Sequence, residues 1–321
     1  MQYPLLEIKN LALEFNTYRG VVKALDDVNF QIFGEESFGL AGESGCGKSV
    51  TALSVLRLVP KPGRIVNGEI IFRGEDLLRK SEKEMRKARG SKISMIFQDP
   101  TSSLNPVFRI GDQISRVIKR HQNLTGKEAR EKALELLEKV EVADPTRALE
   151  LYPHELSGGM KQRVMIAIAL SCHPDLVIAD EPTTSLDVTI QARILDLIRG
   201  LQKDFKSSIF YITHNLAVIA EICDRVGVMY AGDIVELGPT KDIFSSPVHP
   251  YTQNLIKAIP ELGKRERKLV SIRGVVPDLI DPPGGCRFHP RCVRMKSICT
   301  EEKPKLTELD KGHYVACWGT V

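Results

Sequence analysis

The sequence predicts an α/β fold with a phosphate-binding loop, an antiparallel β subdomain, a helical subdomain and a small cysteine-rich C-terminal extension. Short apolar runs such as 38–41 and 209–213 are followed at once by polar residues, which is typical of parallel strands buried on both faces. Apolar and polar residues alternate at 11–15 and 25–32, which predicts strands with one exposed face. Residues 107–150 instead carry apolar positions at helical spacing, and this change of pattern indicates a helical insert.

The composition is that of an ordinary globular protein. The 321 residues suffice for two domains, or for one large domain with an appendage, and 42% of them are hydrophobic. The net charge of +4 is too small, and the basic residues too scattered, to indicate a nucleic-acid partner. No run approaches the roughly 18 apolar residues of a membrane span, and the N-terminus lacks the pattern of a signal peptide. We therefore expect a cytoplasmic protein whose seven cysteines are reduced thiols or metal ligands.

The first two predicted strands are joined by a turn at 16–20 that carries one aromatic residue, Tyr18. Taken by itself, Tyr18 is equally consistent with a packing residue and with a ligand contact.

The next element is a loop with the pattern G-x-x-x-x-G-K-S, Gly-Glu-Ser-Gly-Cys-Gly-Lys-Ser at 42–49. It follows the strand at 38–41 and opens a helix predicted over 50–59, which is the context that a phosphate-binding loop requires. Glycines allow successive N–H groups to point at anionic oxygens, and the helix N-terminus adds partial positive charge. Lys48 can reach the terminal phosphates and Ser49 can bind Mg²⁺. A plain glycine-rich turn is disfavoured by the flanking elements. The nucleotide-binding residues predicted here are Gly42, Ser44, Gly45, Cys46, Gly47, Lys48, Ser49 and Val50.

Two strands, 68–72 and 93–97, come next, and the second ends in Gln98 before a loop rich in proline and serine. This glutamine is a hinge candidate, although a simple exit from the strand explains it equally well. In the helical insert, Thr125 and Glu128 form the pattern of a capping box at the start of a helix.

Ser157, Gly158 and Gly159 precede an apolar helix at 163–172, so they are either an anion-binding helix start or a simple cap. The following apolar strand ends in Asp180 and Glu181. Acids at the carboxyl end of a buried strand lie where parallel sheets bind ligands. Asp180 suits Mg²⁺, and Glu181 suits a general base that orients a water molecule.

Ser185-Leu186-Asp187 caps a further helix, and the strand at 209–213 is followed by His214. A lone histidine is usually a structural or surface residue, but at the end of this strand His214 can contact a γ-phosphate. Residues 226–237 predict a hairpin.

Four cysteines lie close together in the C-terminal segment, with five, six and seventeen residues between them: Cys286, Cys292, Cys299 and Cys317. Three explanations are open: unrelated buried thiols, structural zinc and a 4Fe-4S cluster. Zinc sites usually contain close Cys-x2–4-Cys pairs, which are missing, whereas iron–sulfur clusters tolerate wider gaps. We favour the 4Fe-4S cluster, with zinc as the alternative. His289 and His313 leave mixed ligation possible.

Six of these motifs, in this order, resemble the ATP-binding cassette (ABC) subunit of ABC transporters over roughly residues 5–245. The resemblance identifies 42–49 as the Walker A loop, Gln98 as the glutamine loop and 156–162 as the family signature. It identifies Asp180 and Glu181 as the Walker B end, 185–187 as the D-loop and His214 as the switch histidine, and it places Tyr18 where the family stacks an aromatic ring on adenine. It implies a nucleotide-binding domain over 1–245, a helical subdomain over about 99–172 and a C-terminal extension over 246–321.

The family resemblance implies that two cassettes face each other head to tail with ATP and Mg²⁺ between them. Ser157, Gly158 and Gly159 then contact the ATP held by the partner cassette, which is a homologous chain or a second copy. Lys48, Gln98, Glu181 and His214 form the catalytic set, while Ser49, Gln98 and Asp180 hold Mg²⁺. Gln98 and the helical insert couple hydrolysis to two transmembrane permease subunits.

The run His249-Pro250-Tyr251-Thr252 before a cysteine-rich tail resembles the oligopeptide and dipeptide importer branch, some members of which carry an iron–sulfur site in the tail. This resemblance implies an ATP-hydrolysing motor for peptide uptake, peripheral on the inner face of the cell membrane and served indirectly by an external peptide-binding protein. Nickel or glutathione import is the alternative within the branch. A soluble ABC ATPase acting on ribosomes or nucleic acid, and a redox-sensing regulator, are the alternatives outside it.

Overall fold

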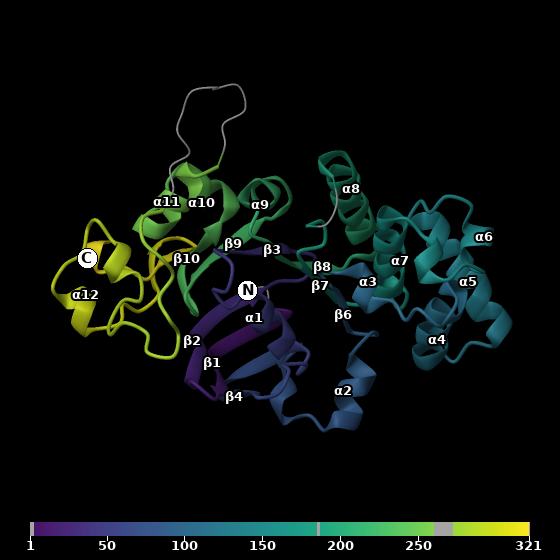
Figure 1. Ribbon diagram of the computed structural model, residues 1–321, viewed down its shortest axis with the longest axis horizontal. Helices are drawn as coiled ribbons and strands as arrows, with labels where there is room; N and C mark the ends of the chain where they lie inside the picture. Colours follow the sequence, from purple (N-terminus) through teal and green to yellow (C-terminus); the bar gives the residue numbers. More distant parts are fainter. Residues whose placement is uncertain (1–2, 185–186, 260–271, 321) are drawn as a thin grey trace. The chain divides into compact units, whose positions relative to one another are not determined.

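A computed structural model describes residues 3–184, 187–259 and 272–320, and its helices and strands are labelled in Figure 1. The chain divides into two compact units. The first comprises residues 1–33, 37–79 and 211–321, and the second comprises residues 34–36 and 80–210.

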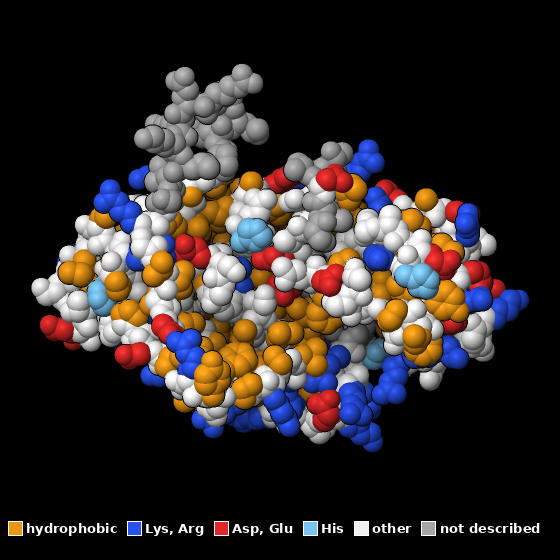
Figure 2. Space-filling model, viewed as in Figure 1, with side chains coloured by type: hydrophobic (Ala, Val, Ile, Leu, Met, Phe, Trp, Pro, Cys, Tyr) orange, Lys and Arg blue, Asp and Glu red, His pale blue; other side chains and the backbone are white. Residues whose placement is uncertain are grey.

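The first unit contains an antiparallel sheet with the strand order β2-β1-β4-β5. The alternating runs predicted near the N-terminus form its first two strands, with Leu11 and Leu13 fully buried and opposite Val28 and Leu25. On the face seen in Figure 2, hydrophobic side chains also reach the surface over this sheet, where Val21 is 39% exposed. The strands are β1 (Leu6–Thr17), β2 (Gly20–Ile32), β4 (Gly63–Phe72) and β5 (Glu75–Asp76).

The first unit also contains a mixed run of strands in the order β11-β12-β10-β9-β3. β3 is parallel to β9, whereas β9 and β10 form the hairpin predicted over 226–237. The strands are β3 (Ser37–Ala41), β9 (Arg225–Tyr230), β10 (Asp233–Pro239), β11 (Thr307–Asp310) and β12 (His313–Val315).

Short helices accompany these strands, and Figure 1 shows α10 and α11 beside β10. α1 ends before the predicted residue 59 because Arg57 adopts a left-handed backbone with φ +52°. The helices of this unit are α1 (Lys48–Val55), η1 (Leu77–Arg79), α9 (Leu216–Ile222), α10 (Thr240–Ser245), α11 (Pro250–Lys257), η3 (His289–Arg291), α12 (Ile298–Glu301) and η4 (Trp318–Thr320).

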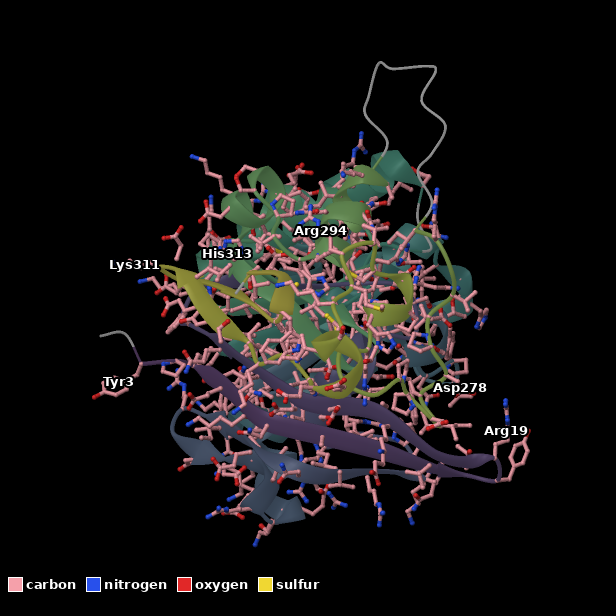
Figure 3. All side chains as sticks on the ribbon, turned by 90° about the vertical axis from the view of Figure 1, so that its left-hand side faces the viewer. Tyr3, Arg19, Asp278, Arg294, Lys311 and His313 are labelled. Carbon is pink, nitrogen blue, oxygen red and sulfur yellow. The ribbon has the colours of Figure 1, made fainter. Side chains whose placement is uncertain are left out.

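The C-terminal segment 272–320 packs along both sheets of the first unit. Lys23 of β2 donates a backbone hydrogen bond to Leu279 over 2.8 Å. Figure 3 shows Arg19, at the turn between β1 and β2, beside Asp278, and their charged groups are 3.9 Å apart. At its other end, β12 adds to the edge of β10. The segment is therefore an integral part of the first unit.

In the second unit, β6 (Ile93–Ile96) and β7 (Leu176–Asp180) form a parallel pair in which every residue is buried. Thr125 and Glu128 make the predicted capping box at the start of α5. α7 contacts β6 and the helices α3, α4, α5 and α8. The helices are α2 (Glu82–Ala88), α3 (Pro100–Ser103), α4 (Ile110–Gln122), α5 (Gly126–Lys139), α6 (Pro145–Ala148), η2 (Pro153–Glu155), α7 (Gly158–Leu170) and α8 (Val188–Phe205).

The boundary between the units falls within β8 (Ser208–Ile212). Among the residues that the structure describes, no helix is both long and apolar enough to cross a lipid bilayer.

Candidate functional site

The phosphate loop joins the end of β3 to the start of α1 in the first unit. Gly42, Gly45 and Gly47 have φ values of +154°, +78° and +111°, which favour glycine. A Cβ atom on Gly42 would lie 2.2 Å from the Met229 carbonyl oxygen, so only glycine fits where the loop leaves the sheet. The sequence pattern therefore has a direct steric cause.

Lys48 closes the loop on itself. Its side chain is buried, and Nζ donates hydrogen bonds of 2.9 Å to the carbonyl oxygens of Gly42 and Glu43. Cys46 is buried beside it, and burial raises the pKa of its thiol. Ser49 and Val50 follow Lys48 in the first turn of α1. A cation held at the mouth of a glycine loop and at a helix N-terminus suits a triphosphate.

His214 follows β8 and is exposed. The Thr213 N–H donates to the Leu40 carbonyl oxygen of β3 over 3.4 Å, so His214 leaves its strand at the end where the phosphate loop begins. Tyr18 is 99% exposed at the turn between β1 and β2, as a ring that stacks on a ligand from outside requires.

In the second unit, β6 and β7 end side by side and bring Gln98 to Glu181. Gln98 Nε2 donates to Glu181 Oε2 over 2.8 Å, and Thr184 Oγ1 donates to the same oxygen over 2.9 Å. Asp180 is 6% exposed at the end of β7, and Glu181 has a φ of +46°, which is uncommon for a non-glycine residue. Positive φ at a strand end aims the carboxylate away from the run of the strand, and such outliers gather at functional sites.

The signature residues lie at the N-terminus of α7. Ser157 is the N-cap, and its Oγ accepts a hydrogen bond of 3.3 Å from the Met160 N–H. A Cβ atom on Gly158 would meet nothing within 4 Å, so this helix end is open. Of the predicted D-loop, Ser185 and Leu186 lie outside the described residues, and Asp187 caps α8 through the Ile190 N–H.

Each unit thus assembles part of the predicted site. Lys48, Ser49 and His214 belong to the first unit, whereas Gln98, Asp180 and Glu181 belong to the second. The magnesium set of Ser49, Gln98 and Asp180 draws on both units and stays a prediction.

The predicted metal site in the tail is wrong. Cys286, Cys292, Cys299 and Cys317 all lie within 272–320, yet the described residues contain no group of three or more His, Cys, Asp or Glu side chains that could hold a metal ion. This finding overturns the 4Fe-4S cluster, and it removes the structural zinc alternative as well.

Burial, with a smaller contribution from the neighbouring thiols, raises the pKa of the Cys286 thiol to about 11, and burial raises the pKa of Cys292 and Cys317 too. The two histidines considered for mixed ligation have other partners: His289 pairs with the Cys286 carbonyl oxygen, and His313 with Glu236.

Sequence reasoning missed the contacts between the tail and the phosphate loop. Arg291, one residue before Cys292, binds Glu43 of the loop, and Tyr251 of the His-Pro-Tyr-Thr run binds the Glu43 N–H. The run His249-Pro250-Tyr251-Thr252 had been noted in the sequence, and it was the one indication that Tyr251 could have a role. Nothing in the pattern around Arg291 indicated its partner.

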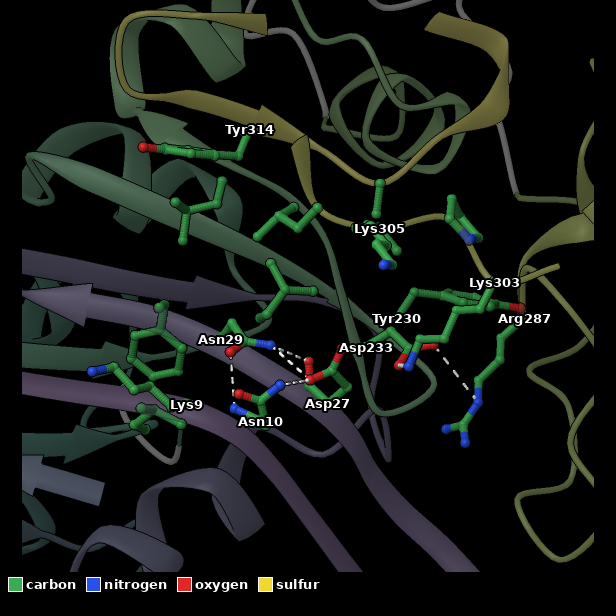
Figure 4. A pocket seen from close by; sticks show the side chains of 18 of the residues that line it. Lys9, Asn10, Asp27, Asn29, Tyr230, Asp233, Arg287, Lys303, Lys305 and Tyr314 are labelled. Carbon is green, nitrogen blue, oxygen red and sulfur yellow. Dashed lines mark hydrogen bonds and ion pairs between the residues drawn. The ribbon is translucent and has the colours of Figure 1, made fainter. Parts of the chain in front are cut away.

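A cavity of about 690 Å³ opens in the first unit between β1, β2, β10 and the tail. Figure 4 shows a hydrogen-bonded group of Asn10, Asp27 and Asn29 in its wall, and Lys303 and Arg287 from the tail. Cys286 is the one predicted site residue among those that line it. This cavity is distinct from the phosphate loop.

Two family models match the chain. The model for ABC transporters matches residues 25–184, and the model for the C-terminal region of oligopeptide/dipeptide transporters matches residues 235–299. The second match includes α11 and three of the four tail cysteines, Cys286, Cys292 and Cys299.

Similar proteins cover nearly the whole chain. A probable peptide ABC transporter ATP-binding protein of Sinorhizobium fredii is 51% identical, over 98% of this chain and 94% of its own. The dipeptide transport ATP-binding protein DppD of Bacillus subtilis is 47% identical over 98% of this chain and 94% of its own. The oligopeptide transport ATP-binding protein OppD of Bacillus subtilis is 48% identical, over 98% of this chain and 88% of its own.

Among solved structures, the chain is similar to a dimeric ATP-binding cassette in a post-hydrolysis state bound to ADP and Pi. The TM-score is 0.66 at 26% identity, over 73% of this chain and 98% of the other. The predicted ABC-type α/β core is confirmed by this likeness. With the two family matches and the relatives, it shows that this chain belongs to the ATP-binding proteins of the ABC transporter family.

Proposed function

We propose that this ABC ATPase energises the uptake of di- and oligopeptides through separate membrane subunits. The observation that carries the substrate class is the match of residues 235–299 to the oligopeptide/dipeptide transporter C-terminal region. Relatives named for peptide, dipeptide and oligopeptide transport support it, because they align over 98% of the chain rather than over the cassette alone.

In the proposed reaction, Lys48 and the amides of the glycine loop hold the β- and γ-phosphates of ATP. Ser49, Gln98 and Asp180 would hold Mg²⁺, which would neutralise charge on the phosphate oxygens. Glu181 accepts a proton from the attacking water, and its hydrogen bonds to Gln98 and Thr184 fix the carboxylate for that task. His214 contacts the γ-phosphate, and Tyr18 stacks on the adenine.

The proposed partners follow from the same assignment. A second cassette, identical or homologous, places its Walker A loop opposite the open signature end at Ser157, Gly158 and Gly159. The conformational change that accompanies ATP hydrolysis is transmitted to two transmembrane permease subunits. An external peptide-binding protein delivers the peptide to them. The chain then acts at the inner face of the cell membrane.

Reconstitution in lipid vesicles tests this function. The chain is purified with its permease subunits, the vesicles are loaded with ATP, and uptake of a labelled dipeptide and a labelled oligopeptide is measured. We expect ATP-dependent peptide uptake that Lys48→Ala abolishes. Uptake of nickel or glutathione in place of peptides would overturn the substrate class. Full uptake with Lys48→Ala would overturn the motor itself.

A further inference from the structure

The C-terminal segment binds the side chain of Glu43, the second residue of the phosphate loop. Arg291 Nη1 and Nη2 donate to the two carboxylate oxygens of Glu43 over 2.8 and 3.2 Å, in the two-pronged geometry that guanidinium groups favour. Arg291 is itself fixed: its Nε donates to the Arg273 carbonyl oxygen over 2.8 Å, and its side chain is 4% exposed. The Glu43 side chain is 28% exposed, so the pair is only partly shielded, and its two-pronged geometry is what distinguishes it from an ordinary surface pair.

A second contact fixes the backbone of the same residue. The Glu43 N–H donates to the Tyr251 hydroxyl over 2.9 Å. Tyr251 is fully buried, and its ring lies 4.7 Å from the Tyr230 ring and 5.4 Å from the Phe288 ring, between centroids. This aromatic cluster fixes the position of the hydroxyl and therefore that of the loop's first turn.

A third contact connects Glu43 to the phosphate-binding lysine. Lys48 Nζ donates to the Glu43 carbonyl oxygen over 2.9 Å. The carboxylate, the amide and the carbonyl of Glu43 are thus bound by Arg291, Tyr251 and Lys48. Any shift of the Glu43 peptide changes the hydrogen bonding of Lys48, so the tail and the phosphate site share one peptide unit.

We propose that Arg291 and Tyr251 are positioning residues of the nucleotide site, through which the C-terminal region sets the phosphate loop in its ATP-binding shape. The proposal rests on the proposed ATPase function and adds a regulation of that site. It assigns the tail a role in ATP affinity, separate from the chemistry at Glu181. A partner that pulls on the tail then alters nucleotide affinity through Glu43.

The rest of the tail has its own attachments, which makes this contact separable from folding. Arg287 pairs with Asp26 over 3.2 Å, and Lys303 lies 2.7 Å from Asp233. Figure 4 shows Arg287, Lys303 and Asp233 together in the wall of the cavity. The backbone pairing of β12 with β10 adds a further attachment. Removing the Arg291 contact therefore leaves the tail docked.

Binding of a fluorescent ATP analogue to the full-length protein tests the proposal, together with steady-state hydrolysis. Arg291→Gln removes the two hydrogen bonds from the guanidinium group to Glu43, and Tyr251→Phe removes only the hydroxyl. We expect each to weaken nucleotide binding about tenfold, as the loss of a buried hydrogen bond to a charged or backbone group does. KM for ATP rises while kcat at saturating ATP stays within about twofold, because Glu181 is untouched.

Matched variants separate positioning from general damage. Arg294→Gln makes the same change three residues away. Arg294 lies exposed and donates to Gln253 Oε1 of α11 over 2.9 Å (Figure 3), so we expect parental affinity. Arg291→Lys keeps the positive charge but cannot make the two-pronged contact. We expect its affinity to lie between that of the parent and that of Arg291→Gln. We expect Glu43→Gln to weaken nucleotide binding as much as Arg291→Gln does. The double variant should bind the nucleotide no more weakly than either single variant.

Unchanged affinity in both Arg291→Gln and Tyr251→Phe, even with a lowered melting temperature, would overturn the proposal. An equal loss with Arg294→Gln would overturn it too, since the effect would then follow charge alone. If Lys48→Ala binds the nucleotide as tightly as the parent, the nucleotide site itself is misassigned, and this outcome is distinct from the other two.

Discussion

Gln98 donates a hydrogen bond of 2.8 Å to the Glu181 carboxylate, although the two residues stand 83 positions apart in the chain. The parallel pairing of β6 with β7 makes this contact possible, because both strands end at the same edge. Gln98, predicted as a hinge and as a coupling residue, is therefore bonded to the residue predicted as the base. The contact gives Gln98 a physical means of affecting hydrolysis.

Glu181→Gln tests the base directly. Glutamine keeps the size of the side chain and one oxygen acceptor for Gln98 and Thr184, but it cannot accept a proton from water. We expect phosphate release to fall by about 10²–10⁴-fold while ATP binding is retained. Steady-state phosphate release and nucleotide titration measure the two quantities. Hydrolysis at the parental rate would show that another group is the base.

Gln98→Ala tests the hydrogen bond from the other side. The variant leaves the carboxylate in place but removes the hydrogen bond that Gln98 donates, so the carboxylate samples more orientations. We expect kcat to fall several-fold, by roughly the worth of one hydrogen bond. Thr184→Val removes the hydrogen bond that Thr184 donates to the same carboxylate, and its effect on kcat should be of similar size. A loss of ATP affinity with unchanged kcat would contradict this role for Gln98.

Local patterns could be predicted from the sequence where one short segment carries the physical cause. The glycine loop needs positive φ at Gly42 and Gly47, and the capping box at Thr125 involves residues three positions apart, so each is visible in a few letters. The contact between Arg291 and Glu43 spans 248 positions and depends on how the tail packs, which no local period encodes. The four-cysteine metal site was predicted from spacing along the chain alone, and the described residues contain no group of three or more His, Cys, Asp or Glu side chains that could hold a metal ion.

Gly42→Ala tests the steric origin of the loop. A methyl group there would lie 2.2 Å from the Met229 carbonyl oxygen and 2.7 Å from Cys46 Sγ, at a φ of +154°. Because backbone must shift to relieve the contact, we expect a loss of about 1–3 kcal/mol in unfolding free energy, together with weaker ATP binding. Chemical denaturation measures the first quantity. Gly34→Ala is the control, since a Cβ at Gly34 meets nothing within 4 Å.

Asp233 predicts a pH dependence of stability. Burial raises the pKa of its carboxyl to about 6, and the attraction of Lys303 and Arg287 reduces this rise without cancelling it. The unfolded value is 3.8, so between about pH 4 and pH 6 the folded state binds the proton more strongly. The stabilisation is therefore complete below about pH 4 and is lost as the pH rises through 6.

Asp233→Asn removes this titration while keeping the shape of the side chain. We expect the unfolding free energy of the parent, minus that of the variant, to fall by roughly 2 kcal/mol between pH 4.5 and 7.5. Urea denaturation across this range measures it. Asp26 does not interfere with this measurement. At Asp26, the effect of burial is outweighed by Lys303, so the pKa of its carboxyl is lowered. The contribution of Asp26 to stability is therefore lost only at more acidic pH. A difference that is flat or that rises with pH would show that the ion pair with Lys303, rather than burial, controls Asp233.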